Sequence, residues 1–240
     1  MSILLRKIFF TFFLSLLILP LVAQRRVVEH LQQADQKLLH FGFTLGMHTK
    51  EFAFQPSEVV DYEGIVWYGD VVNPLPGFTV GIVSDLRFGE YFNLRFIPTL
   101  NFGDRQIVFS GFQNGVKTRE YSTNVLSTLV ALPFYVKYRS ERVQNYRPYL
   151  IAGGGIMVDL SRKKDLPILL KPMDYYIEFG VGSDIYMPYF KLSPEFKMCI
   201  GFANMIERNR PLIQNEANLK YTDAIKRLGS RLFVLTFNFE

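Results

Sequence analysis

Most of the chain after His40 alternates between apolar residues and polar or small residues, with a period of two. In the segment 41–47 the odd positions hold Phe41, Phe43, Leu45 and Met47, whereas glycine and threonine fill the even positions. The same alternation recurs in seven later segments, and it is typical of half-buried strands, not of helices. It predicts eight strands, at residues 39–53, 76–88, 90–112, 116–139, 146–160, 174–187, 189–202 and 230–239.

The second face of these strands separates two all-β folds, a soluble sandwich and a membrane barrel. The outer face of a sandwich is usually rich in Lys, Glu and Thr. Here the second face is rich in Gly, Tyr and Ser, with isolated charges of both signs, which suits the narrow interior of a small barrel. The sequence therefore predicts an all-β fold, an eight-stranded antiparallel transmembrane outer-membrane β-barrel.

The lengths of the connections support the barrel. Connections two, four and six are short, near 88–89, 140–145 and 187–188, whereas 54–75, 161–173 and 203–229 are long. The third connection is a tight turn at Asn114–Gly115, but it joins strands far longer than the roughly ten residues that span a bilayer. The hairpin 100–128 should therefore project beyond the membrane. Short turns on one side and long loops on the other are typical of outer-membrane barrels, and they place both termini of the chain on the periplasmic side.

The beginning of the chain has the layout of a secretory signal peptide. Arg6 and Lys7 precede an apolar run, Ile8 to Leu19, and cleavage is predicted after Ala23. A retained membrane anchor is the alternative, although twelve apolar residues are few for a spanning helix. We predict three parts: a signal peptide at 1–23, a periplasmic leader at 24–38 and an outer-membrane barrel domain at 39–240.

Composition and charge exclude several kinds of site and partner. The 240 residues include 23 Phe and 13 Tyr, and the single cysteine, Cys199, excludes an internal disulfide framework and a four-cysteine zinc site. The net charge of +5 comes without a long Lys/Arg run, so we expect no nucleic-acid partner. The last strand ends in alternating aromatics up to Phe239, as barrel-assembly machinery requires, and Glu240 departs from the usual terminal Phe.

Charged residues recur on the predicted inner face. Six are basic and five acidic, and this near balance predicts a packed, salt-bridged lumen, since unpaired charges there would be costly. An ion-selective pore, the alternative, would favour one sign. Glu178 and Glu195 could form an acid–base pair, but Lys191 and Lys197 share their face, which favours ion pairs. The inward charges are Asp85, Arg87, Arg95, Lys137, Arg139, Asp159, Glu178, Asp184, Lys191, Glu195 and Lys197.

The sequence gives little support for a catalytic site or a metal site. Of His30, His40 and His48, the last two lie about 27 Å apart along one strand, too far for one metal. His48 with Asp85 or Ser84 is the one candidate for a rim hydrolase or acyltransferase. The glycine runs at 153–155 and 180–182 lie inside strands, where they bend the strand or make room for tyrosines, and not at the start of a helix. We predict no enzyme, no catalytic, cofactor or metal residues and no small-molecule substrate.

The segment 203–229 lacks alternation. Residues 221–228 could form two helical turns that begin near Thr222 or Asp223 and stop at Gly229. The segment is either a solvated loop or a docking surface. If it is a docking surface, we expect deletion of 205–227 to leave the barrel inserted in the membrane and to abolish the function of the protein.

Three stretches resemble the PorT family, called SprT in gliding bacteria. They are Leu31 to Gly46, Ala131 to Arg139 with its leucine-proline and lysine-tyrosine pairs, and Tyr221 to Arg231. The resemblance covers about 30–240. It implies a non-enzymatic outer-membrane barrel required for type IX secretion, with outer-membrane lipid and other type IX components as partners. A general outer-membrane barrel acting in adhesion or membrane integrity is the alternative.

Overall fold

The structure is a computed structural model of the chain, and it describes residues 28–57, 59–61, 64–70, 75–161, 169–208 and 222–240. The expected signal peptide at 1–23 and the first residues of the expected leader lie outside these ranges. Within the described ranges, no helix is long and apolar enough to cross a bilayer.

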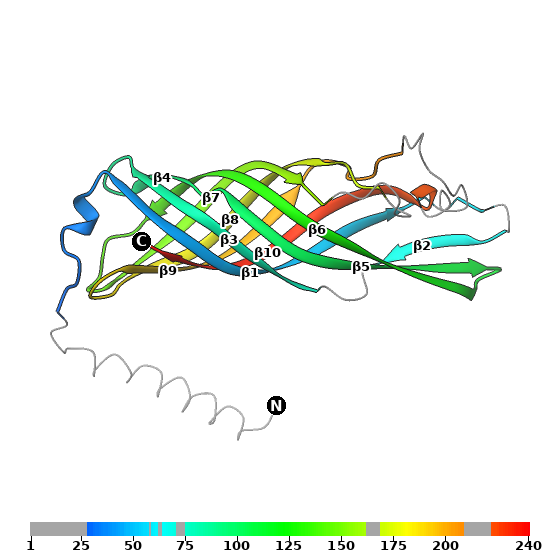
Figure 1. Ribbon diagram of the computed structural model, residues 1–240, viewed down its shortest axis with the longest axis horizontal. Helices are drawn as coiled ribbons and strands as arrows, with labels where there is room; N and C mark the ends of the chain where they lie inside the picture. Colours follow the sequence, from blue (N-terminus) through cyan, green and yellow to red (C-terminus); the bar gives the residue numbers. More distant parts are fainter. Residues whose placement is uncertain (1–27, 58, 62–63, 71–74, 162–168, 209–221) are drawn as a thin grey trace, which may run out of the picture.

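Antiparallel strands form one sheet that closes on itself (Figure 1). Around the ring β1 is followed by β10, β9, β8, β7 and β6, then by β4 and β5 in one position, and then by β3, which pairs again with β1. The ring therefore has eight positions, and the predicted all-β barrel is confirmed. The strands are β1 (Leu39–Pro56), β2 (Val66–Asp70), β3 (Pro76–Arg87), β4 (Phe92–Phe96), β5 (Thr99–Gln113), β6 (Val116–Arg139), β7 (Tyr146–Asp159), β8 (Met173–Tyr186), β9 (Lys191–Gly201) and β10 (Ile225–Phe239).

The third predicted strand is interrupted. Ile97 and Pro98 separate β4 from β5, although both strands pair with β3 on one side and with β6 on the other. Proline lacks the N–H that a central strand needs. The Pro98 carbonyl still accepts a hydrogen bond from the Ile82 N–H at 3.1 Å, so the break costs little pairing.

Two predictions for the connections were wrong. The connection 54–75 contains a strand, β2, which pairs with Val108–Phe112 of β5. The second helical turn predicted within 221–228 is absent, because β10 begins at Ile225 and pairs with the end of β1. Ile225 and Leu228 are fully buried in an apolar cluster, and burial against β1 outweighs the weak helix propensity of so short a segment.

The two ends of the ring differ. The turns at 88–91, 140–145 and 187–190 lie at one end, here called the short-turn end, together with residues 28–38 and Glu240. The β5–β6 hairpin and the described parts of the long connections lie at the other, the long-loop end, where the hairpin projects with β2 alongside (Figure 1). Asn114 and Gly115 both have positive φ, 50° and 79°, which confirms the predicted tight turn.

Side chains alternate between the two surfaces of the ring. Apolar residues such as Phe43, Phe196 and Phe237 are exposed on the outer surface, and their polar neighbours Thr44, Lys197 and Asn238 are buried inside. The interior is mainly charged in the short-turn half. In the long-loop half it is largely apolar, with clusters built around Cys199 and Trp67.

Candidate functional site

The lumen of the short-turn half is centred on Arg95 of β4. Its guanidinium is fully buried and contacts three carboxylates: Asp85 of β3 at 2.7 Å, Glu240 at 2.8 Å, and Glu195 of β9. A buried cation is tolerated only when such partners compensate for its lost hydration. Arg95 thereby ties β4 to strands on the opposite side of the ring.

Lysines extend this network in both directions. Lys137 contacts Asp184 at 2.8 Å, and Ser193 donates a further hydrogen bond to Asp184 at 2.6 Å. Lys191 contacts Glu240 at 2.7 Å. Arg95, Lys137 and Lys191 thus each meet a carboxylate from outside their own strand, which confirms the predicted salt-bridged lumen in this half.

Lys197 lies between the two glutamates that could have formed an acid–base pair. Its ammonium nitrogen is 3.5 Å from Glu178 and 3.6 Å from Glu195. Glu178 also accepts a hydrogen bond from Tyr135 at 2.8 Å, and Glu195 accepts one from Tyr149 at 2.7 Å. Both carboxylates are therefore held in ion pairs, as Lys191 and Lys197 had suggested.

Ten of the eleven predicted inward charges are buried. The exception is Arg87, which is half-buried at the short-turn end and donates to the backbone carbonyls of Asp35 and Gly89. Its position at the end of β3 explains the difference, since the ring no longer encloses it. The predicted set was nevertheless incomplete, because Lys50, Arg147 and Asp174 in the strands are buried as well.

Glycines inside the strands make room for the two lumen tyrosines. Gly182 is the cross-strand neighbour of Tyr149, and a Cβ atom at Gly182 would lie 2.6 Å from the Tyr149 ring. Gly153 is the neighbour of Tyr135, and a Cβ there would lie 2.8 Å from that ring. The interpretation that these glycines accommodate tyrosines is confirmed.

Little empty space remains in the described lumen. One void beside Tyr135 and Lys197 has a volume of about 20 Å³, and another beside His48 and Asn101 has about 10 Å³. Each can hold about one water molecule. In the short-turn half, the fully buried side chains of Arg95 and Lys137 cross the ring and leave no path for a peptide among the described residues.

The rim candidate for catalysis is not assembled. His48 of β1 lies opposite Gly77, whereas Asp85 lies opposite His40, eight residues further along the strand. His48 Nδ1 instead contacts the hydroxyl of Thr79 at 2.9 Å, and Asp85 binds Arg95. The alternative that would pair His48 with Asp85 or Ser84 is therefore not formed, because the β1–β3 register separates them.

Residues 28–38 cross the short-turn end. A short 3-10 helix, η2 (Ala34–Gln36), presents Asp35 to Arg147 at 2.9 Å, Arg142 at 3.3 Å and Arg139 at 3.7 Å. Tyr186 donates a hydrogen bond to the same carboxylate at 2.6 Å. Burial favours the neutral acid, but the Tyr186 hydrogen bond and the Arg147 charge outweigh it and lower the pKa of Asp35 below its usual value.

The sequence analysis missed both Asp35 and Glu240 as members of these networks. Glu240 could have been found, because it continues the inward parity of Thr236 and Asn238 beyond the last aromatic residue. Asp35 lies in a segment without alternation, and its partners come from β6, β7 and β8 and from the β6–β7 turn. No local pattern in the sequence predicts that convergence.

Apolar packing closes the long-loop half. Trp67 of β2 and Phe109 of β5 are buried against residues from β1, β10 and the connections, so β2 covers this end. The segment around 203–207, expected as a solvated loop or docking surface, contributes Met205 and Ile206 to the same cluster. These two residues therefore stabilise the barrel and are not available for docking.

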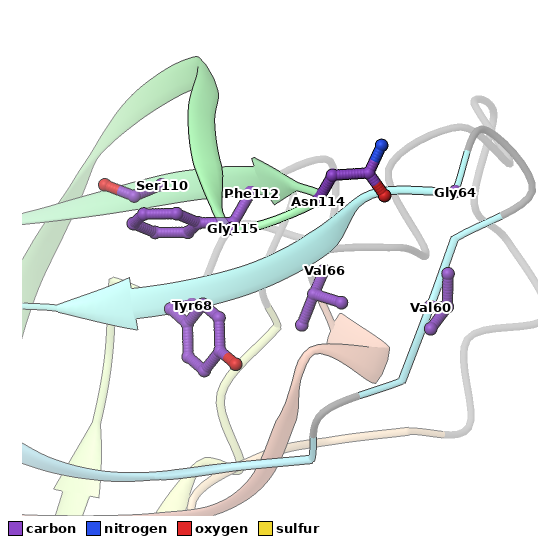
Figure 2. A pocket seen from close by; sticks show the side chains of 8 residues that line it. All are labelled: Val60, Gly64, Val66, Tyr68, Ser110, Phe112, Asn114 and Gly115. Carbon is purple, nitrogen blue, oxygen red and sulfur yellow. The ribbon is translucent and has the colours of Figure 1, made fainter.

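A groove of about 710 Å³ lies beyond that cluster, at the tip of the β5–β6 hairpin. Figure 2 shows it between β2, which contributes Val66 and Tyr68, and the hairpin, which contributes Phe112 and the turn at Asn114. The rings of Tyr68 and Phe112 meet edge to face, with centroids 5.6 Å apart. The projecting hairpin and β2 thus form one partly apolar, accessible surface.

Comparison with known proteins identifies a family but no individual relative. The model of a family described as outer membrane protein beta-barrel domain matches residues 23–207, which reach from before β1 to beyond β9. β10 follows the matched range and closes the ring between β9 and β1. A search of curated proteins finds no match.

Proposed function

The chain belongs to the outer membrane protein β-barrel domain family, and on that premise we propose that it is a non-enzymatic accessory of protein secretion. It is an outer-membrane barrel, and the resemblance of 31–46, 131–139 and 221–231 to the PorT family favours the type IX system. That system exports folded cargo. The proposed role is to assemble or support the secretion machinery.

The observation that carries the accessory role is the filled lumen. Arg95, Lys137 and Lys197 bridge strands across the interior, and the voids beside them have volumes of about 10 and 20 Å³. Folded cargo cannot pass such an interior. A barrel of this kind acts through the surfaces that it presents to partners.

The hairpin groove is the surface at the long-loop end that best fits a partner. Val60 and Tyr68, which line it, are 59% and 38% exposed. Exposed apolar side chains beyond the lipid-facing band mark an interaction site. In barrels of this family type the long loops face outward, so this surface would meet a partner outside the membrane.

Deletion of 205–227, the earlier test of a docking loop, is unsuitable. It would remove Ile225, Lys226 and Arg227 from β10 and two buried residues, Met205 and Ile206, from the apolar cluster. We now expect this deletion to prevent barrel closure, so a loss of export would have no clear cause.

A better experiment begins with deletion of the gene and comparative proteomics of the culture medium. We expect secreted proteins with a shared C-terminal signal to accumulate in the periplasm. An unchanged set of secreted proteins would overturn the proposal and favour the alternative role in adhesion or membrane integrity.

A matched pair of variants then tests the groove. Val60→Asp lies in the wall of the groove, and Leu160→Asp lies elsewhere at the long-loop end with a similar exposed fraction, 63% against 59%. We expect Val60→Asp to reduce export while the barrel stays folded, as judged by heat-modifiable electrophoretic mobility. Leu160→Asp should leave export unchanged, and equal effects of the two variants would contradict a role for the groove.

A further inference from the structure

A cluster of three arginines at the short-turn end shares a single contacting carboxylate. Arg139, Arg142 and Arg147 converge on one acid, Asp35, which belongs to the segment 28–38 and not to the ring. Among the residues that the structure describes, Asp35 is the one carboxylate within 4 Å of these three guanidinium groups. Three cations with one anion leave a binding site for negative charge wherever Asp35 is removed.

Neutral backbone atoms hold the arginines in place. Arg139 and Arg147 both donate to the carbonyl of Glu90, at 3.3 and 3.1 Å, and Arg142 donates to the carbonyl of Gln144 at 2.7 Å. Carbonyl groups orient a guanidinium without cancelling its charge. The cluster is therefore preorganised by the turns of the ring and does not depend on Asp35 for its shape.

The nearest lumen acids are already engaged. Asp184 accepts hydrogen bonds from Lys137 and Ser193, and Asp85 accepts them from Arg95 and Asn93. Neither carboxylate can turn to the short-turn end without leaving a buried cation uncompensated. In this structure the carboxylate that fills the cluster therefore comes from outside the lumen, from Asp35.

The same end also binds peptide main chain. The Asn145 side chain accepts a hydrogen bond from the His30 N–H and donates one to the Val28 carbonyl, both at 2.9 Å. Arg142 donates to the His30 carbonyl. A site that binds three main-chain groups of Val28 and His30, and the carboxylate five residues after His30, recognises an acidic peptide better than a free anion.

Residues 28–38 are held there by polar contacts and not by apolar burial. Val28 is 73% exposed and Leu38 is 67% exposed, and η2 buries none of its residues. Exposed and half-buried polar contacts contribute modest free energy and weaken with salt. The segment can therefore be displaced without exposing an apolar core.

We propose that the short-turn end is a docking site for an extended acidic segment of a partner protein, and that Asp35 with residues 28–38 is its resident occupant. The partner's carboxylate replaces that of Asp35 between the three arginines and Tyr186. Its main chain replaces Val28 and His30 at Asn145. Because short turns face the periplasm in such barrels, the partner would approach from that side, independently of the hairpin groove.

The test uses the purified full-length barrel in detergent and a synthetic peptide that copies residues 28–38 with a fluorescent label. In the wild-type protein the tethered segment competes at high effective concentration. Asp35→Asn weakens that competitor and leaves the arginines intact. We expect the peptide to bind Asp35→Asn at least about tenfold more tightly than wild type, as measured by fluorescence anisotropy.

Three controls define the outcome. A peptide with asparagine in place of its aspartate should bind neither protein, Asp35→Glu should behave like wild type, and Arg147→Gln added to Asp35→Asn should abolish binding. Equal binding to wild type and Asp35→Asn, or equal binding of the two peptides, would overturn the proposal. So would complete displacement of the peptide by 10-fold excess inorganic phosphate, because the site would then be a simple anion site.

Discussion

The two halves of this barrel are closed by different forces. In the short-turn half, charged side chains cross the lumen, and Asp35 holds a peptide segment over the end by ion pairs. In the long-loop half, β2 and the connections bury Trp67, Phe109 and their neighbours. One barrel interior is thus filled in two ways. We expect the stability of the charged half to depend on salt and pH, and the stability of the apolar half to depend on the volume of its side chains.

The largest expected effect comes from Arg95→Met. The substitution leaves Asp85, Glu195 and Glu240 buried without their shared cation, so we expect a loss of about 5 kcal/mol in the free energy of unfolding, at the upper end for a broken buried ion pair. Urea unfolding in lipid vesicles, followed by tryptophan fluorescence, measures it.

The double variant Arg95→Met with Glu195→Gln is the control for that prediction. Removing one of the stranded charges should recover part of the lost stability, because less negative charge is then uncompensated. If Arg95→Met alone unfolds at the wild-type urea concentration, the charges do not stabilise the short-turn half.

In the other half, Phe109→Ala should cost about 3–4 kcal/mol, through lost apolar burial and a cavity beside Trp67. The cost should be the same in low and high salt, because no charge is involved. Phe112→Ala, at a partly exposed ring on the same strand, is the matched control and should cost clearly less. A strong salt dependence for Phe109→Ala would remove the proposed contrast between the halves.

The smallest expected effect concerns pH and residues 28–38. The pKa of Asp35 is below its usual value near 4, so its stabilising contribution is fully present above about pH 4 and is lost as pH falls through the lowered pKa. At pH 8, where Asp35 is ionised, we expect tryptic cleavage after Lys37 to be slow in wild type and fast in Asp35→Asn. At about pH 2, below the usual pKa of an aspartate, the difference between the two proteins in hydrogen exchange of residues 28–38 should become smaller.

High salt provides the second measurement of the same contact. Cleavage of wild type after Lys37 should accelerate at 1 M salt, where screening acts over roughly 3 Å, while Asp35→Asn should change little. Equal cleavage of both proteins at low salt would show that Asp35 does not hold the segment.

The sequence predicted the ring well because period-two alternation is a local signal. The bounds of β7 and β8 differ from the predictions by at most one residue at each end. The same parity placed Arg95 and Glu195 inside. It could not tell which charges would meet, because the pairing of His40 with Asp85 across β1 and β3 depends on how the whole ring closes.

The misses have physical reasons of the same kind. β2 is only five residues long, and it gains stability from β5 and from the burial of Trp67, not from its own pattern. Ile225 lies in a segment with local helix signals that tertiary packing overrides. Pro98 alone could not reveal the break in the third strand, because Pro133, Pro148 and Pro194 lie inside uninterrupted strands.

The Asp35 contact also bears on the order of events during assembly. Tyr186 and Arg147 lie 151 and 112 residues further along the chain, and they come together only when β6, β7 and β8 are paired. Residues 28–38 can therefore settle over the end only after most of the ring exists. These residues therefore dock only on a folded barrel. A partner that binds either the vacant or the occupied site would distinguish folded molecules from assembly intermediates.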